Sequence, residues 1–256
     1  MDKIFLDRIT SNVRETRDRI DIAARKSGRH GSDVTLVAVS KYAATGDKMI
    51  DALVAAGCID LGEARPQLLQ EKAEFYASYQ IRWHLIGSLQ RNKIRKIIPV
   101  TNLIHSLDSI RLAEAINRIV QEERDVVQKE CDVQKDDAGN FLTNVKPVHC
   151  LLEVAISGDV GKHGFVPQEI SESLEQLGEL KNIVIDGLMC MSGLESDEHE
   201  TRREFAAVRQ LAESLRQHGT PPNIKLEILS MGMSGDFEIA VEEGATLVRI
   251  GSRLYQ

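Results

Sequence analysis

The sequence predicts a single (β/α)8 barrel, an α/β fold, with one additional helix before the first strand. Eight short apolar runs alternate with helix-like runs at a recurrence of roughly 20 to 40 residues, which indicates repeated βα units. The chain of 256 residues also has the size of one barrel rather than of two small domains. An open doubly wound sheet is the alternative. It is less favoured because no G-x-G-x-x-G fingerprint follows the first strand.

The elements follow one another regularly along most of the chain. An amphipathic helix is expected over 1–28 and ends at Gly28. The expected strands are 35–41, 59–62, 82–87, 103–106, 148–156, 183–189, 225–229 and 246–250. The expected helices between them cover about 47–56, 66–78, 91–98, 108–128, 167–177, 198–218 and 236–243. Pro66 suits a first helical turn, and Asp108 is expected to cap the helix that follows it.

One segment, 129–146, interrupts this regular order. It is polar and aperiodic, and a strand resumes directly after Pro147. We therefore expect a flexible surface insertion within one domain over 1–256, with no domain boundary.

Composition excludes several classes of protein. The net charge of -7 and the pI of about 5.6 argue against a nucleic-acid partner. The four cysteines form no C-x-x-C pair and the histidines are scattered, so no metal site or redox dithiol is expected. No apolar stretch approaches the roughly 20 residues of a spanning helix, and the first ten residues lack a signal-peptide core. A cytoplasmic monomer without membrane association is the expected state.

The run TLVAVSK over 35–41 contains the main candidate for chemistry. It is typical of a strand buried on both faces, and Lys41 comes at its carboxyl end, where parallel α/β folds keep their functional groups. Apolar neighbours are expected to desolvate Lys41 partly, which suits an amine that forms imines. The alternative is an ordinary solvated lysine after a strand.

Two glycine-rich loops are expected at the same end of the barrel. They are 230–235, SMGMSG, and Gly251 with Ser252, which follow the seventh and eighth strands. Barrels commonly bind phosphate with these two loops, where glycines let backbone N–H groups approach an anion. Arg249 would point inward to such a ligand or form an ion pair inside the barrel. The alternative for each loop is a tight βα turn without a ligand.

Two further features have a functional and a structural interpretation. His84, beside Trp83 in the third strand, is interpreted as a hydrogen-bonded core residue rather than a catalytic one. The run Lys162-His163-Gly164 reaches the ligand or forms a solvated loop.

Four segments of the chain resemble the pyridoxal 5'-phosphate homeostasis proteins, the YggS/PROSC family. They are LVAVSK over 36–41, WHLIGSLQRNK over 83–93, SGDVGKHGF over 157–165 and LSMGMSGDFEIAVEEGATLVRIGS over 229–252. The similarity covers nearly the whole chain. The L-S-M-G-M-S-x-D-F segment with V-R-I-G downstream is the most specific part.

The resemblance implies a fold similar to the N-terminal barrel of alanine racemase, with pyridoxal 5'-phosphate held as an internal aldimine on Lys41. It places Ser230, Ser234, Gly251 and Ser252 around the phosphate and Arg249 at the pyridine nitrogen or the phosphate. The cofactor-binding set is completed by two residues of the same loop, Met231 and Gly232.

The chain departs from the family pattern at two positions. Ala64 and Ala155 stand where family members often have asparagine. The resemblance therefore implies that two amide side chains near the cofactor are missing here, while Lys41 and the phosphate loops are intact.

Three functions are compatible with these residues. The resemblance implies a carrier that holds pyridoxal phosphate and passes it to pyridoxal-phosphate-dependent apoenzymes. The alternatives are a racemase or decarboxylase using the same cofactor, and an aldolase-like barrel in which Lys41 acts directly on a carbonyl. We expect little racemase or decarboxylase turnover. In alanine racemase one proton-transfer group comes from a separate C-terminal domain, and this sequence ends six residues after the last expected strand.

Overall fold

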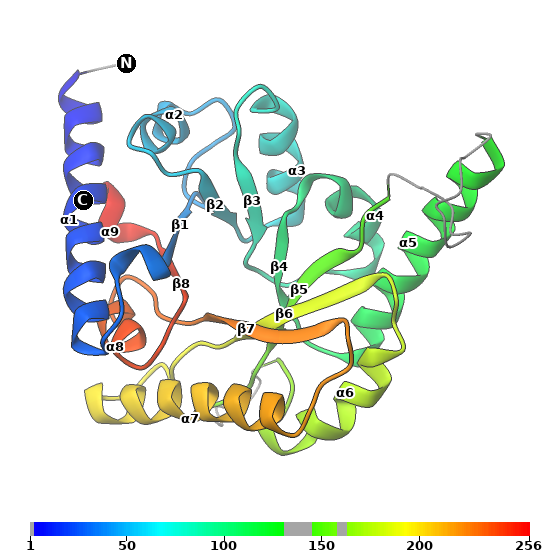
Figure 1. The fold of residues 1–256 in the computed structure, drawn as a ribbon. Helices are drawn as coiled ribbons and strands as arrows, with labels where there is room; N and C mark the ends of the chain where they lie inside the picture. Colours follow the sequence, from blue (N-terminus) through cyan, green and yellow to red (C-terminus); the bar gives the residue numbers. More distant parts are fainter. Residues whose placement is uncertain (1–2, 131–144, 158–162) are drawn as a thin grey trace.

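The protein folds as a closed barrel of eight parallel strands in the computed structural model, which describes residues 3–130, 145–157 and 163–256. Each strand pairs with its neighbours in sequence, and β1 pairs with β8 to close the barrel (Figure 1). This confirms the predicted (β/α)8 fold and excludes the open sheet. The insertion expected at 129–146 lies almost entirely outside the described residues.

The strands are β1 (Thr35–Val39), β2 (Asp60–Glu63), β3 (Arg82–Leu85), β4 (Leu103–Leu107), β5 (Val148–Glu153), β6 (Ile183–Met189), β7 (Ile224–Ser230) and β8 (Leu247–Ile250). The helices are α1 (Lys3–Lys26), α2 (Lys48–Ala55), α3 (Pro66–Phe75), α4 (Ile94–Ile97), α5 (Ile110–Glu130), α6 (Ile170–Gly178), α7 (Glu198–Gln217), α8 (Phe237–Glu242) and α9 (Ser252–Tyr255). Short 3-10 turns precede β1, flank α4 and precede α6. Of these, α9 and the 3-10 turn before β1 were not expected, because segments this short carry no period of their own. The other 3-10 turns lie wholly or partly within the segments 91–98 and 167–177, which were expected to be helical.

Several helix ends follow from local chemistry. Gly28 adopts a φ of +72°, and Arg29 N–H donates to Ala24 O at 2.9 Å, so α1 ends in a Schellman turn as predicted. Pro66 is the first residue of α3, also as predicted. The expected cap of α5 is wrong by one residue: the Ser109 hydroxyl accepts from Leu112 N–H at 3.3 Å, and Asp108 accepts from the Ser109 hydroxyl instead.

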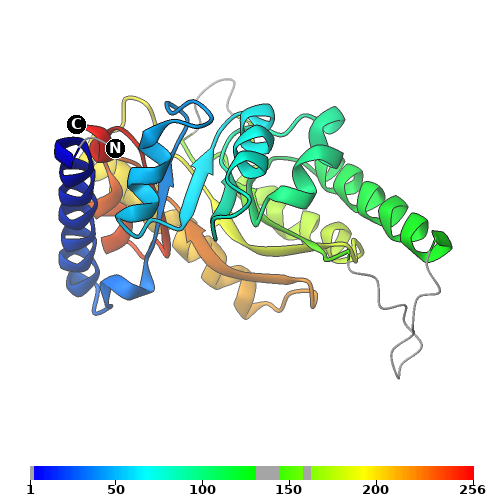
Figure 2. The same ribbon diagram turned by 90° about the horizontal axis from the view of Figure 1, so that it is seen from above.

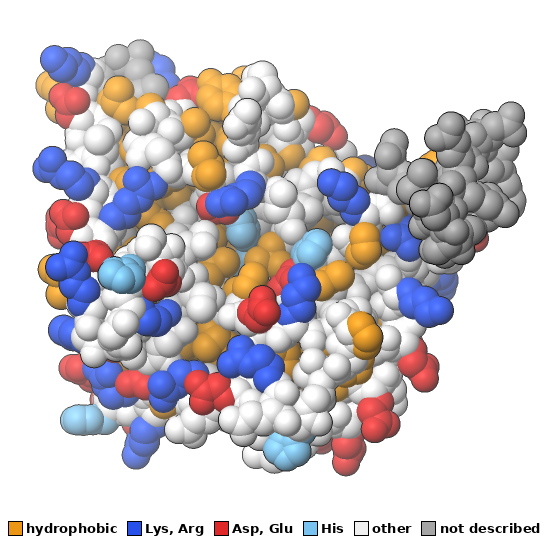
Figure 3. Space-filling model, in the orientation of Figure 1, with side chains coloured by type: hydrophobic (Ala, Val, Ile, Leu, Met, Phe, Trp, Pro, Cys, Tyr) orange, Lys and Arg blue, Asp and Glu red, His pale blue; other side chains and the backbone are white. Residues whose placement is uncertain are grey.

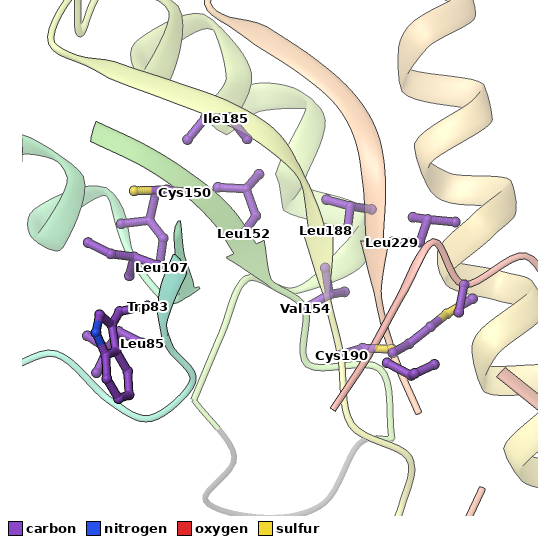
Figure 4. Close-up of a cluster of buried hydrophobic side chains, with 14 of the residues drawn as sticks. Trp83, Leu85, Leu107, Cys150, Leu152, Val154, Ile185, Leu188, Cys190 and Leu229 are labelled. Carbon is purple, nitrogen blue, oxygen red and sulfur yellow. The ribbon is translucent and has the colours of Figure 1, made fainter. Parts of the chain in front are cut away.

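The main core lies between the strands and the ring of helices. Outward-facing strand residues pack there against the buried faces of α1 to α8. Figure 4 shows Leu152, Leu188 and Leu229, which come from β5, β6 and β7, within this layer. Each of the three is buried. This layer is what holds the barrel strands in place.

The inside of the barrel is divided between apolar and polar side chains. A small apolar cluster contains Val37, Leu103, Leu151, Met189 and Leu247, with Ile228 packed against it. Other interior positions are polar, and they share a face with these apolar residues because alternate residues of a strand point the same way. They include Asp60, His84, His105, Ser230 and Arg249, all of which are buried. A buried polar interior of this kind needs internal hydrogen bonds.

The N-terminal helix α1 packs against the last two helices, α8 and α9. In Figures 1 and 2, α1 lies along the outside of the barrel beside α8 and α9. Asn12 Nδ2 donates to the carbonyl of Leu254 at 3.2 Å, and Arg19 forms a bidentate pair with Glu238 at 2.5 and 2.7 Å. The additional helix therefore supports both α8 and the segment that follows β8.

The sheet is irregular between β6 and β7. The register shifts between Ile185 and Gly187 on β6, and β7 compensates at Leu226, whose φ is +55°. A leucine in the left-handed region is unusual. Leu226 has no exposed surface, and its carbonyl accepts from Arg216 at 2.7 Å. The bulge thus has a buried side chain and a side-chain hydrogen bond to stabilise it.

On the face shown in Figure 3, positive and negative side chains are interspersed rather than gathered into a patch of one sign. In the described part of the chain, no helix combines the length and the apolar composition needed to cross a membrane.

Candidate functional site

Lys41 lies in a turn directly after β1, at the carboxyl end of the barrel. Its side chain is exposed, and its Nζ lies 5.0 Å from the centre of the Tyr42 ring. The expected partial desolvation of Lys41 is therefore wrong. The strand ends at Val39, two residues earlier than predicted, so the lysine has left the apolar environment of the barrel wall. Its amine is accessible to a ligand from solvent.

The backbone that carries Lys41 is held by a fully buried ion pair. Lys72 of α3 contacts Glu63 at the end of β2, and neither side chain has exposed surface. Lys72 Nζ also donates to the carbonyl of Ser40 at 2.9 Å. Glu63 accepts from the N–H groups of Ala64 and Arg65 at 2.8 and 3.0 Å. The pair therefore joins the ends of β1 and β2.

The loop between β7 and α8 is the first of the two glycine-rich loops. Gly232 adopts a φ of +93°, and a Cβ there would lie 2.6 Å from Ala240 Cβ, so only glycine fits against α8. Met231 is fully buried beneath the loop. Asp236 accepts from Met233 N–H at 2.6 Å and from the Ser192 hydroxyl at 2.8 Å. The first bond holds the loop closed, and the second joins it to the segment after β6.

The second loop, between β8 and α9, is bonded to the first. Gly251 N–H donates to the Ser234 hydroxyl oxygen at 3.2 Å. A Cβ on Gly251 would lie 3.5 Å from Val39 Cβ, so this loop also borders the end of β1, where Lys41 follows. Among the described residues, the backbone N–H groups of Ser234, Gly235 and Ser252 donate to no protein acceptor. They are available to an anion.

Ser230 and Arg249 lie below these loops, inside the barrel. Ser230 has no exposed surface, and Arg249 is 5% exposed. Arg249 Nη1 donates to the hydroxyl and the carbonyl of Ser230 at 2.6 and 2.7 Å, and Nη2 donates to Cys190 O at 2.9 Å. Arg249 thus points inward, as expected, and it donates to hydroxyl and carbonyl oxygens rather than to a carboxylate. Burial lowers the pKa of the Arg249 guanidinium.

His84 is a core residue, as interpreted from the sequence. It is 5% exposed and is hydrogen-bonded through both ring nitrogens, to Asp60 Oδ1 and to His105 Nε2, each at 3.0 Å. His105 Nδ1 in turn lies 2.9 Å from Ser230 Oγ. Burial, with His84 and Arg249 nearby, lowers the pKa of His105 well below its ordinary value. His105 was not singled out in the sequence, because nothing around it forms a motif.

Glu153, at the end of β5, is a second residue that sequence reasoning missed. Burial and then Asp108 raise the pKa of its carboxyl, while Arg249 and His163 act in the opposite direction. Its place at a strand end would have been the only signal. His163 is exposed, and Lys162, its predicted companion, lies outside the described residues.

The structure brings most of the predicted residues to one end of the barrel. Lys41, Ser234, Gly251 and Ser252 lie around the ends of β1, β7 and β8. Ala64 and Ala155, the two positions that lack an expected amide, follow β2 and β5 at the same end and are partly exposed. A cavity of about 490 Å³ lies at the opposite end, lined by Asp60, Arg82 and Thr35 among others. We place the site at the carboxyl end, because the accessible amine and the free N–H groups are there.

These residues fit an anionic cofactor that carries an aldehyde. The unpaired N–H groups of the two loops suit a phosphate, and the exposed Lys41 amine on the adjacent strand end suits a carbonyl. Among the described residues, no group of His, Cys, Asp and Glu side chains could hold a metal ion.

Comparison with known proteins gives a consistent family. The family model described as alanine racemase, N-terminal domain, matches residues 4–256. A pyridoxal phosphate homeostasis protein of Synechocystis is 35% identical over 223 residues, covering 87% of this chain and 90% of that protein. A protein of Bifidobacterium adolescentis described as unknown has a TM-score of 0.84 at 34% identity, covering 100% of this chain and 97% of its own.

A third comparison is with a solved structure that contains a ligand. PipY of Synechococcus elongatus, solved with pyridoxal phosphate bound, has a TM-score of 0.77 at 32% identity, covering 97% of this chain and all of its own. The sequence, the barrel and the loops at its carboxyl end lead to one assignment: the chain belongs to the pyridoxal phosphate homeostasis protein family, within the wider family of alanine racemase N-terminal domains.

Proposed function

We propose that this protein binds pyridoxal 5'-phosphate at the carboxyl end of its barrel and serves in the homeostasis of that cofactor. The observation that carries the proposal is the combination of an accessible Lys41 amine with two adjoining loops in which, among the described residues, the N–H groups of Ser234, Gly235 and Ser252 have no protein acceptor. The names of the relatives, and the pyridoxal phosphate bound to PipY, support it.

Each residue has a defined task in this proposal. When bound, the cofactor supplies an aldehyde that condenses with a lysine amine and a phosphate that requires donors. Lys41 provides the amine. Ser234, Gly251 and Ser252, with Met231 and Gly232 shaping the first loop, provide the phosphate cradle. Ser230 and Arg249 form the polar floor beneath it.

We further propose that the protein holds and passes on the cofactor without substantial turnover. The guanidinium of Arg249 stays charged even with its pKa lowered by burial, because an arginine starts far above neutral pH. If Arg249 faces the pyridine nitrogen of the cofactor, it is therefore a poor proton donor to that nitrogen, and the ring would be a poor electron sink for turnover. Recipient apoenzymes, a monomeric state and a cytoplasmic location belong to the same proposal.

One observation favours the enzyme alternative, a racemase or decarboxylase. The raised pKa of Glu153 is what a general acid near a site requires. Incubation of the cofactor-loaded protein with L-alanine and other amino acids in deuterated water, followed by chiral analysis, decides between the two. We expect little exchange. Turnover approaching the roughly 10 per second typical of enzymes would show that the protein is an enzyme rather than a carrier.

A titration of the purified protein separates both from the aldolase alternative. Added pyridoxal phosphate is expected to give a new absorption band that borohydride abolishes, with the cofactor retained on the protein. The aldolase alternative predicts a different result. The protein would remain colourless with pyridoxal phosphate, and borohydride would link a sugar phosphate to it, which would mean that Lys41 acts directly on a carbonyl substrate.

Ser234→Asp is expected to weaken binding of pyridoxal phosphate far more than binding of unphosphorylated pyridoxal. The substitution places a negative charge beside Gly251 N–H, where the phosphate is proposed to lie. Ser234→Ala is the control, since it removes the same hydroxyl without adding charge. Equal losses for the two ligands with Ser234→Asp would place the phosphate elsewhere.

A further inference from the structure

A continuous hydrogen-bonded chain of buried side chains crosses the barrel interior. It begins at Asp60, the first residue of β2, and passes through His84 of β3 and His105 of β4 to Ser230, the last residue of β7. The three contacts measure 3.0, 3.0 and 2.9 Å. The chain thus runs from the amino end of one strand to the carboxyl end of another, where it meets Arg249.

Asp60 defines one end of the chain. Arg82 donates to both of its carboxylate oxygens, at 2.8 and 2.5 Å. Burial alone would raise the pKa of Asp60, but the hydrogen bonds from His84 and Arg82 outweigh it and lower that pKa. An ionised carboxylate only accepts hydrogen bonds. His84 must therefore carry a proton on Nε2.

The remaining protons follow from the other end of the chain. Ser230 accepts from Arg249 Nη1, so its own hydroxyl proton goes to His105 Nδ1, which is therefore bare. His105 is neutral at pH 7, so its one ring proton is on Nε2 and is donated to His84 Nδ1. Every member of the chain is satisfied in this single arrangement, as buried polar groups require.

The direction of the chain has a consequence for Arg249. With its proton committed to His105, the Ser230 hydroxyl turns its lone pairs away from the histidines, and Arg249 Nη1 donates to it at 2.6 Å. In the opposite direction Ser230 would accept from both His105 and Arg249, and its own proton would need another acceptor. The inferred arrangement gives Arg249 the stronger acceptor.

We propose that Asp60, His84 and His105 are positioning residues that fix the Ser230 hydroxyl and hold the Arg249 guanidinium beneath the phosphate loops, with both histidines protonated on Nε2. They act through Ser230 and Arg249 and do not touch the ligand. The effect on cofactor binding rests on the proposed function, whereas the proton positions do not.

The barrel offers a matched control at its amino end. Asp186 of β6 also accepts from a histidine and a cation, His149 Nδ1 at 2.5 Å and Lys225 Nζ at 3.1 Å. Neither of these two hydrogen bonds leads to Ser230 or Arg249. Asp186→Asn therefore removes a similar charge from the same end of the barrel without interrupting the chain.

The first test uses the cofactor-free protein. Side-chain nitrogen NMR of ¹⁵N-histidine-labelled protein reports which ring nitrogen carries the proton. We expect His105 to be neutral and protonated on Nε2. In Asp60→Asn the amide can also donate to His84, so a mixture of the two His105 tautomers is expected, while Asp186→Asn should match the wild type. A His105 proton on Nδ1 in the wild type, or an unchanged tautomer in Asp60→Asn, would overturn the proposal.

The second test measures pyridoxal phosphate binding and the absorption band of the bound cofactor. Asp60→Asn is expected to weaken binding about fivefold or more, in the usual range of coupling between distant sites, and to shift the band. Ser230→Ala should have a comparable effect, and the double variant should lose little more, because both changes interrupt one chain. Asp186→Asn combined with Ser230→Ala should be additive instead.

The outcomes are distinguishable. The affinity for pyridoxal phosphate could instead fall additively in Asp60→Asn and Ser230→Ala, or equally in Asp60→Asn and Asp186→Asn. Either result would mean that the hydrogen-bonded chain only stabilises the fold and does not position Arg249. If the wild type binds no pyridoxal phosphate, the proposed function fails, and the NMR result still decides the direction of the chain.

Discussion

Glu63→Gln is expected to lower the free energy of unfolding by about 3–5 kcal/mol, because it leaves Lys72 as an uncompensated buried charge. Neither side chain of this pair has exposed surface. Lys72→Met should cost a similar amount for the reciprocal reason. The double variant, which removes both charges, should be clearly less destabilised than the sum of the two single changes.

Thermal unfolding measures this effect. For a chain of this size the expected loss corresponds to a fall in Tm of about 6–20 °C. The control is Glu122→Gln, which removes an exposed pair with Arg95 and should change stability by only about 0.5 kcal/mol. Comparable shifts for Glu63→Gln and Glu122→Gln would mean that the buried pair is not the support of the Lys41 turn.

Gly187→Ala is expected to destabilise the protein by about 3 kcal/mol or more, at the upper end of what overpacking costs. A Cβ at this position would lie 1.8 Å from the carbonyl oxygen and 2.7 Å from the nitrogen of Ile228. These are backbone atoms of the adjacent strand, so no side-chain rotation relieves the clash. The barrel must open locally between β6 and β7.

Gly235→Ala is the matched control, because nothing lies within 4 Å of the Cβ it adds. It should change the midpoint of denaturant unfolding very little. Equal midpoints for Gly187→Ala and Gly235→Ala would show that the contact between β6 and β7 is looser than the structure indicates.

The architecture could be predicted from the sequence because its signals are local and repeated. Strands such as 183–189 are apolar runs between turn residues, and helices such as α7 carry their own period and their own cap at Asp197. The bulge between β6 and β7 could not be predicted. It depends on strand pairing, and Leu226, which adopts the left-handed conformation there, is not a residue that favours it.

The candidate site could be predicted only in part. Lys41 and the glycine loops follow strands directly, so a list of strand ends recovers them. Three kinds of information were missing. The exposure of Lys41 depends on where β1 stops, the support from Lys72 is a contact between α3 and β2, and the chain through His105 joins four strands. All three are properties of tertiary packing.

The most direct test of the account is the site of covalent attachment. Wild-type protein loaded with pyridoxal phosphate and reduced with borohydride should retain one cofactor, and peptide mapping by mass spectrometry should place it on Lys41. Lys41→Ala should fold and lose this attachment, whereas Lys48→Ala, which changes another exposed lysine in the same segment, should retain it. Attachment of the reduced cofactor at a single other lysine, or its full retention in Lys41→Ala, would contradict the account.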